Sequence, residues 1–535
     1  MKRILTFIII IIASSCSSML EEEVFDKVTP QNFFQKESDA VIGVNGVYDG
    51  IQNHNYWYWQ WVMAEALPGS LAHTWNVRFN TMVYTDFDSQ LWPLWTQSYN
   101  TIGRANSVLS VLESSPLEES VKNALMGEVR FVRGMIYFNM VRMFGHIPLV
   151  KDVPASIGDA KLPEEGADAS AFESEYLKQV DREVVYDFII EDLEFAETNL
   201  PVATFNGGVD TGRARKGAAT ALLAKVYLTQ AGMQYNYTTG ALESGDASKY
   251  AMAASKAAEV IGGVYDLEAN YADIFENSND NNEEILFSIQ YLESSVAGVE
   301  GEGTQFVART GIRGANITPY AWKQAFTNRP FYDSWVAANG TADSRYDVTF
   351  LTSYVNNAGN TVNYGSGNFI QPHVWKFVSD DNNPDIAALG ATDYGDNPIY
   401  LRYADVLLMH SEALNEAGGT PDANTISGIN RVRERAGQPL ITLPITQEDL
   451  REAIWQERKW ELGFEGHYFF DCQRTGKLID EITQNWYTKA DNGGGNPRNI
   501  PLSAVTEKFY ILPIHFNAMS ANSSLVQNAG WVTGG

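Results

Sequence analysis

The sequence feature that most constrains the fold is a recurring helical pattern whose segments end at glycine or proline. Within residues 127–144, apolar side chains recur at steps of three and four residues, as on one face of an α-helix. Gly145 ends this pattern, because glycine accommodates the backbone turn at a helix C-terminus, and Pro148 prevents the helix from resuming. Further segments have the same helical character: 217–231, 250–261, 401–417, 423–436 and 446–462.

Small residues accompany this pattern. Alanines are frequent in 217–231 and 250–261, and small side chains let neighbouring helices approach closely. Helix pairs that are joined by short turns and carry such faces are typical of tetratricopeptide repeats. Roughly 70 to 140 residues separate the pairs, so we expect a scaffold that carries long excursions rather than a continuous solenoid.

Three long segments between the helices, 62–95, 291–345 and 352–400, are rich in glycine, asparagine, aspartate, threonine and aromatic residues. Loops of this length in a compact protein usually carry function. Residues 285–291 have the pattern of a β-strand. The predicted fold class is therefore mostly α-helical, a tetratricopeptide-like scaffold of helix pairs with long irregular loops and a few short strands.

Two groups of aromatic residues precede the first strong helix and are assigned to packing. Trp57, Trp59 and Trp61 alternate along the chain, which indicates either a strand face or an N-terminal packing segment. The second group recurs at helical spacing and consists of Trp92, Trp95 and Tyr99.

The N-terminus has the pattern of an export signal. Lys2 and Arg3 precede a short apolar run, which ends in small residues just before Cys16. Residues 1–15 are therefore predicted to be a secretory signal peptide. We predict that Cys16 is acylated after cleavage just before it, and two acyl chains suffice for stable anchoring in a membrane. Ala13 occupies a position where leucine is usual, so an ordinary signal peptide that precedes a cysteine is the alternative.

Composition excludes several classes of partner. The formal charge is −28, from 66 acidic and 38 basic residues, whereas nucleic acids and anionic lipid surfaces attract basic patches. After the leader no run of 18 apolar residues remains, so we expect no membrane-spanning helix. If Cys16 carries lipid, Cys472 is the one remaining cysteine, and we expect it to be a buried apolar side chain. We predict neither a metal site nor a cofactor.

The C-terminal half contains the most recognisable motifs. Arg402-Tyr-Ala-Asp-Val-Leu-Leu-Met-His-Ser-Glu-Ala-Leu-Asn-Glu416 is followed by Ile429-Asn-Arg-Val-Arg-Glu-Arg-Ala-Gly437. These motifs resemble those of the SusD/RagB family, the lipoproteins of starch-utilisation-type nutrient uptake systems, and the resemblance covers nearly the whole chain. The other matching blocks are 16–23, 28–34, 43–49, 104–109, 127–133, 144–150, 216–228, 457–466, 474–476, 510–514 and 527–531.

The resemblance implies both an organisation and a function. A SusD-like N-terminal region over 16–280 would carry helical repeats and binding loops, a RagB/SusD C-terminal region would span 281–535, and the two would form one compact unit. Family members are surface glycan-binding proteins, held at the outer membrane by lipid, that cap a SusC-like TonB-dependent transporter and deliver oligosaccharide to it. The resemblance therefore implies the same localisation, the same partner and the same ligand class for this chain.

The candidate binding residues are chosen by their chemistry, because the family has no fixed ligand motif. Sugar rings present apolar faces, on which aromatic side chains stack, and hydroxyl groups, which amide and guanidinium groups bind. Residues of these kinds cluster in two of the excursions. We predict ligand contacts from Trp75, Asn76, Arg78, Arg309, Arg313, Asn316, Tyr320 and Trp322.

Charged residues within the C-terminal motifs have two interpretations. Arg402, Asp405 and Glu412 lie at helical spacing, and Glu457 precedes Arg458 directly. We interpret them as ion pairs that fix helix packing, and the alternative is a binding site among the repeats.

An enzyme and a peptide-binding protein are the competing functional classes. The sequence contains no His-Glu-x-x-His, no Gly-x-Ser-x-Gly, no phosphate-binding loop and no cluster of cysteine and histidine. We therefore predict that the protein is not an enzyme. Peptide uptake stays open as the alternative, because helical repeats often bind extended peptides.

Overall fold

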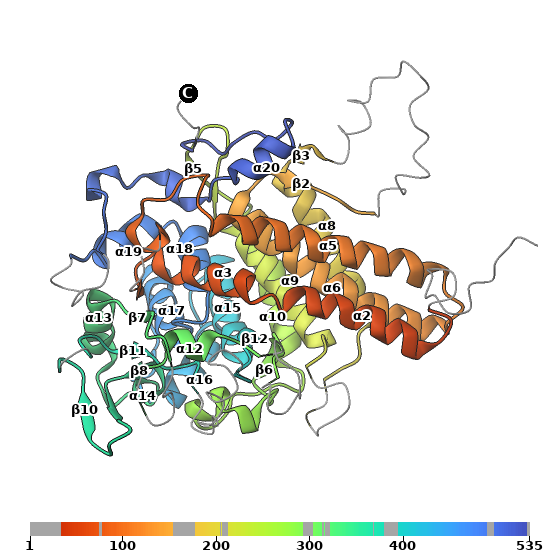
Figure 1. Cartoon of the computed structure of the whole chain (residues 1–535). Helices are drawn as coiled ribbons and strands as arrows, with labels where there is room; N and C mark the ends of the chain where they lie inside the picture. The colour runs from red at the N-terminus through yellow and green to blue at the C-terminus, as the bar shows by residue number, and fades with distance from the viewer. Residues whose placement is uncertain are drawn as a thin grey trace, which may run out of the picture.

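The computed structural model describes residues 34–73, 78–152, 177–203, 205, 212–292, 303–312, 315, 321–366, 369–378, 394–488 and 497–531. Helices dominate this part of the chain (Figure 1). The predicted signal peptide and Cys16 lie outside the described residues.

Long antiparallel helices build the body of the molecule. They pack as a chain of neighbours, in which α6 contacts α8, α8 contacts α9, α9 contacts α10, and α10 contacts α15. Figure 1 shows α2, α5 and α6 side by side at one end of this layer. The predicted mostly helical, tetratricopeptide-like fold is therefore confirmed. The helices of the layer are α2 (Glu37–Ile51), α5 (Leu91–Ser114), α6 (Glu119–Phe144), α8 (Arg182–Asn199), α9 (Lys216–Ala231), α10 (Lys249–Ile261), α15 (Tyr403–Glu416), α16 (Ala423–Arg435) and α17 (Gln447–Glu461).

Sequence periodicity located most of these helices but missed some partners. The helix predicted at 127–144 begins earlier, at Glu119, and its neighbours α5 and α8 were not predicted as helices. The pairs α5–α6 and α6–α8 are therefore closer along the chain than the wide separation of helix pairs that the sequence predicted. The predicted start of α17 is confirmed, because the Thr446 hydroxyl accepts a hydrogen bond from the Asp449 amide at 3.0 Å.

The helix predicted at 401–417 begins two residues later than expected. Residues Ile399–Arg402 form strand β12, which pairs antiparallel with β6 (Ile285–Ser288), and Leu401 lies opposite Phe287. Strand β6 confirms the strand predicted at 285–291, although it is shorter. The sheet pairing takes precedence at Leu401 because it satisfies backbone groups that a first helical turn would leave unpaired.

The three excursions contain more regular structure than was predicted. Trp57, Trp59 and Trp61 belong to helix α3 (His54–Ala66), not to a strand, and α3 overlaps the start of the first excursion. Trp57 and Trp61 are buried, which confirms the packing interpretation. Trp95 is also buried, on α5.

Short antiparallel strand pairs and short helices form the rest of the excursions. Figure 1 shows those of the later excursions gathered beside α16 and α17. The strand pairs of the excursions are β1 (Leu71–His73) with β7 (Ala325–Thr327), β8 (Phe350–Leu351) with β11 (His373–Val374), and β9 (Ser353–Val355) with β10 (Thr361–Asn363). Two further pairs lie between the helices of the layer, β2 (Ile147–Pro148) with β3 (Gln179–Val180), and β4 (Met233–Tyr235) with β5 (Leu242–Ser244). The short helices of the excursions are α4 (Arg78–Thr81), α12 (Phe306–Thr310), α13 (Arg329–Asn339) and α14 (Tyr346–Thr349). Three more short helices follow α17, namely α18 (Tyr468–Thr475), α19 (Leu478–Gln484) and α20 (Phe516–Ala521).

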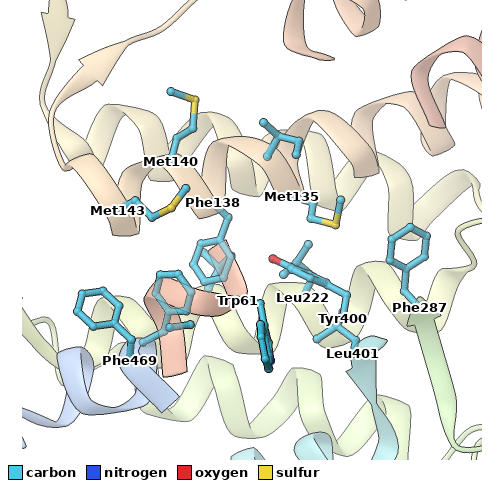
Figure 2. Close-up of a cluster of buried hydrophobic side chains, with 14 of the residues drawn as sticks. Trp61, Met135, Phe138, Met140, Met143, Leu222, Phe287, Tyr400, Leu401 and Phe469 are labelled. Carbon is cyan, nitrogen blue, oxygen red and sulfur yellow. The ribbon is translucent and has the colours of Figure 1, made fainter. Parts of the chain in front are cut away.

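One large hydrophobic core joins the helical layer to α3 and α18. Figure 2 shows Trp61 from α3, Phe138 from α6 and Tyr400 from β12 pointing toward one another inside it. Phe469 of α18 belongs to the same cluster, and so does Cys472. The thiol of Cys472 is buried, as predicted, and burial raises its pKa.

A buried ionic network ties β12 to the C-terminal helices. The Arg402 guanidinium contacts Glu284 at 2.9 Å, Glu461 at 2.6 Å and Glu465 at 2.7 Å. Asp405 accepts a hydrogen bond from Lys225 at 2.9 Å. The remaining predicted charges are paired in the same way, Glu412 with Arg474, Glu457 with Arg345 and Arg433, and Arg458 with Asp405 and Asp471. The interpretation of these motifs as structural ion pairs is confirmed.

None of the helices in the described part of the chain is both long and apolar enough to cross a bilayer.

Candidate functional site: an exposed tryptophan braced by arginine

A short β-ladder brings the first two excursions together. Strands β1 and β7 pair antiparallel, with His73 opposite Ala325. The C-terminal end of β1 therefore lies next to the start of β7, into which the segment 321–324 leads. The first two excursions therefore meet at this ladder.

The segment that contains Trp322 is fixed to helix α12 by its backbone. The Trp322 amide donates to the Ala308 carbonyl at 2.5 Å, and the Gln324 amide donates to the Arg309 carbonyl at 2.8 Å. Between them, Lys323 has a φ of 54°, a left-handed conformation that is uncommon for a residue with a side chain. Such local strain persists only where the surrounding structure holds it, as these hydrogen bonds do here.

The Arg309 guanidinium lies against two aromatic rings. Its central carbon is 4.1 Å from the ring centroid of Tyr58 and 5.1 Å from that of Trp322. Its terminal nitrogens donate to the side-chain oxygen of Gln324 at 2.9 Å and to that of Gln305 at 2.8 Å. Two amides thus hold the guanidinium at its edge while the rings contact its faces, so that Arg309 forms a rigid support for the indole.

Tyr58 and His54 extend this support inward along α3. Their rings stack at 5.5 Å, and the Tyr58 hydroxyl is 2.7 Å from Nε2 of His73. Burial lowers the pKa of His54 to about 3, and the nearby charge of Arg309 acts in the same direction. His54 is therefore neutral at physiological pH and serves as packing rather than as a proton donor.

Trp322 presents the open surface of this site. It is 37% exposed, which is unusual for a side chain of this size. The six residues that form the site, which we call the Trp322 face, are His54, Tyr58, Gln305, Arg309, Trp322 and Gln324. They offer an aromatic ring and hydrogen-bonding groups but no carboxylate, so these six residues supply no pair of groups for acid–base hydrolysis.

The predicted ligand residues have three different outcomes. The structure brings Arg309 and Trp322 together, as just described. Arg78 begins α4, where it is exposed and lies 3.5 Å from Asp88. The other predicted residues lie outside the described part of the chain, namely Trp75, Asn76, Arg313, Asn316 and Tyr320.

Sequence reasoning missed four of the six residues. Gln305 and Gln324 flank Arg309 and Trp322 closely, so proximity in sequence offered a signal for both. The sequence contains no such signal for His54 and Tyr58, because these residues contact Arg309 and its neighbours only when α3 packs against α12.

Among the described residues, no group of histidine, cysteine, aspartate and glutamate is arranged to hold a metal ion.

Comparison with known families identifies the chain. A family model described as the SusD family matches residues 212–531, which is more than half of the sequence. The chain belongs to the SusD family. A second model of SusD-like proteins, described as starch-binding associating with outer membrane, matches residues 1–228.

SusD-like proteins also resemble this chain over most of their length. The SusD-like protein P2 of Formosa agariphila is 28% identical, over 98% of this chain and 98% of its own. A SusD-like protein of Bacteroides ovatus is also 28% identical, over 78% of this chain and 72% of its own.

Solved structures show the same fold. A SusD homologue of Bacteroides thetaiotaomicron superposes with a TM-score of 0.74 at 24% identity, covering 94% of this chain and 98% of its own. A laminarin-binding SusD-like protein superposes with a TM-score of 0.69 at 25% identity, covering 93% of this chain and 100% of its own.

Proposed function

We propose that this SusD-family protein binds oligosaccharide without cleaving it and delivers it to a SusC-like TonB-dependent transporter. The Trp322 face is the proposed binding site, and lipid on Cys16 is the proposed anchor to the outer membrane at the cell surface. The observation that carries the proposal is the exposed Trp322 indole, which Arg309 holds from behind at 5.1 Å.

The geometry of the Trp322 face suits a sugar ring. A flat indole that is fixed in place loses little conformational entropy when a ligand stacks on it. The partly exposed Gln305 and Arg309 side chains can bind hydroxyls at the rim of the ring. A laminarin-binding relative of the same fold supports carbohydrate as the ligand class. The other proposed contacts come from 313–320, which lie between Arg309 and Trp322 in sequence, and from 74–78, which follow β1 in sequence: Trp75, Asn76, Arg78, Arg313, Asn316 and Tyr320.

The test is titration calorimetry of the full-length chain in a detergent without a sugar headgroup. The ligands are plant, host and microbial oligosaccharides and a peptide digest. We expect saturable binding of one glycan class, and Trp322→Ala should weaken it by about 2 kcal/mol, roughly 30-fold, as for a central aromatic contact. Arg309→Lys should also weaken glycan binding, because lysine lacks the planar group that supports the indole. The loss should be smaller than for Trp322→Ala, because lysine keeps the positive charge and the indole itself remains.

Phe87→Ala is the matched control, because Phe87 is an exposed aromatic residue (59%) that stacks on Phe516, outside the proposed site. Glycan binding that survives Trp322→Ala unchanged would contradict the proposed site. Binding of peptides alone would contradict the ligand class and favour peptide uptake.

A further inference from the structure

A partly enclosed cavity lies inside the molecule, on the other side of Phe306 from the Trp322 face. Its volume is about 70 Å³, and it is bordered by α3, β6, β12 and α18. Phe306 lies 6.1 Å from the Tyr58 ring of the Trp322 face and stacks at 4.8 Å on Phe377 in the cavity wall. The Phe, Tyr and Trp residues that line the cavity are Trp57, Trp61, Phe275, Phe306, Phe377, Tyr400 and Phe470.

Gln60, a buried residue of α3, lines this cavity. Gln60 is 6% exposed, and its side-chain oxygen forms no hydrogen bond within the described part of the chain. Leaving a buried acceptor unpaired costs about 1–3 kcal/mol, so such a group is a sign of a bound molecule or of water.

His467 provides an unused donor in the cavity lining. Lys225 contacts Nδ1 of His467 at 2.9 Å and the Asp405 carboxylate at 2.9 Å. An ammonium group can only donate, so Nδ1 accepts and Nε2 of the neutral ring carries the proton. Nε2 is buried and has no hydrogen-bond partner among the described residues, and His467 is 6% exposed.

The charges that line the cavity balance. Three positive and three negative side chains border it, so their formal charges sum to zero, and this favours a neutral ligand. They are Arg142, Lys225 and Lys376 against Asp280, Asp396 and Glu465.

The cavity volume sets the size of the ligand. A water molecule needs about 10–15 Å³ of this volume and occupies about 30 Å³ of liquid, so 70 Å³ admits about five to seven waters, or about 150–200 Å³ of molecule. A single pyranose ring is of this size. It also presents apolar faces to aromatic walls, and its hydroxyls both donate and accept.

We propose that this cavity is a second carbohydrate site that binds one neutral sugar ring, with hydroxyls hydrogen-bonded to Gln60 and His467. The ligand class rests on the proposed function, whereas the residues are distinct from those of the Trp322 face. Phe306 lines the cavity and lies 6.1 Å from the Tyr58 ring, so the two sites are neighbours. One protein would then hold an oligosaccharide chain outside and a single ring inside.

The test uses the full-length Trp322→Ala variant, in which the outer site is disabled. We would titrate it with glucose, galactose, mannose and xylose by calorimetry. At least one of these sugars should bind with a stoichiometry of one, and adding Gln60→Leu should weaken that binding about tenfold or more. Gln230→Leu is the matched control, since Gln230 is 5% exposed, has an unpartnered oxygen and does not line the cavity.

A second variant keeps the test decisive if Gln60→Leu fails to fold. Ile289 lines the cavity, and Ile289→Phe should fill it, abolish monosaccharide binding and leave the thermal unfolding temperature unchanged or raised. Absence of binding by all four sugars would overturn the inner site, and so would equal binding with and without Gln60→Leu. Oligosaccharide binding by the unmodified chain would still stand in that case, so the two proposals can fail separately.

Discussion

Glu65, near the C-terminal end of α3, is a buried carboxyl group that forms no ion pair within the described part of the chain. It accepts a hydrogen bond from the Gly466 amide at 2.9 Å. The Ser70 hydroxyl lies 2.6 Å from its Oε2 and 2.9 Å from its backbone carbonyl, but has one proton for both. A protonated Glu65 resolves this conflict, because Oε2–H can donate to Ser70 while Ser70 donates to the carbonyl.

Glu65→Gln should therefore change how stability depends on pH. Burial raises the pKa of Glu65 from 4.5 to about 7. Between these values the folded protein holds a proton that the unfolded chain has lost, so the contribution of Glu65 to stability falls as pH rises. Glutamine mimics the protonated form, and at pH 8 it should raise the free energy of unfolding by about 3 kcal/mol relative to glutamate.

Denaturant unfolding of the variant and the parent across pH 4 to 8, with roughly one-unit steps, measures this difference. The gain should shrink toward zero below pH 4.5. A difference that stays constant over the whole range would contradict the protonated state.

Close helix packing explains one glycine at the scale of elements. Gly428 of α16 faces α15, and a side chain there would place its first carbon 2.2 Å from the Leu407 carbonyl oxygen. The Ser411 hydroxyl of α15 also accepts a hydrogen bond from the Ile429 amide at 3.1 Å. The backbones of the two helices thus approach more closely than a methyl group permits.

Gly428→Ala should separate α15 from α16 and lower stability by about 1–3 kcal/mol, the usual cost of overpacking. Gly103→Ala on α5 is the matched control, because nothing lies within 4 Å of the added carbon. That change should raise stability by about 0.5–1 kcal/mol, since alanine favours the helix. The apparent midpoints of thermal unfolding of the two variants and the parent measure these changes in stability. Equal effects of the two substitutions would contradict the close packing of α15 and α16.

At the scale of the whole molecule, chain segments far apart in sequence form single units. The Arg402 network joins β12, Glu284 and the C-terminal end of α17. Removing one partner of a buried ion pair leaves the other charge uncompensated, which typically costs about 3–5 kcal/mol. The network therefore favours one arrangement of the C-terminal helices around β12.

The proposed lipid anchor also concerns the whole molecule. Cys16→Ala should release the protein from membranes, because the acyl chains would have no attachment site. Cys472→Ala is the control and should leave the protein membrane-bound, since Cys472 lies in the core. Fractionation after a high-salt wash measures both, and a Cys16→Ala protein that stays with the membrane would contradict the anchor.

The sequence predicted the elements better than it predicted the site. Periodicity located α6, α9, α10, α15, α16 and α17, because the helical repeat is a property of neighbouring residues. It failed at α3, where aromatic residues fill all sides and no single apolar face stands out. A helix that is buried on several sides has no separate apolar and polar faces, so its sequence shows no amphipathic periodicity.

The sequence by itself determined the fold class and the family, and it predicted Arg309 and Trp322 as members of the proposed binding site. Only the tertiary structure decided which residues support them. Tyr58 and His54 stand behind Arg309 because α3 packs against α12, and Gln60 borders a cavity because β6, β12 and α18 close around α3. Such contacts depend on how the whole chain packs, and no local pattern records them.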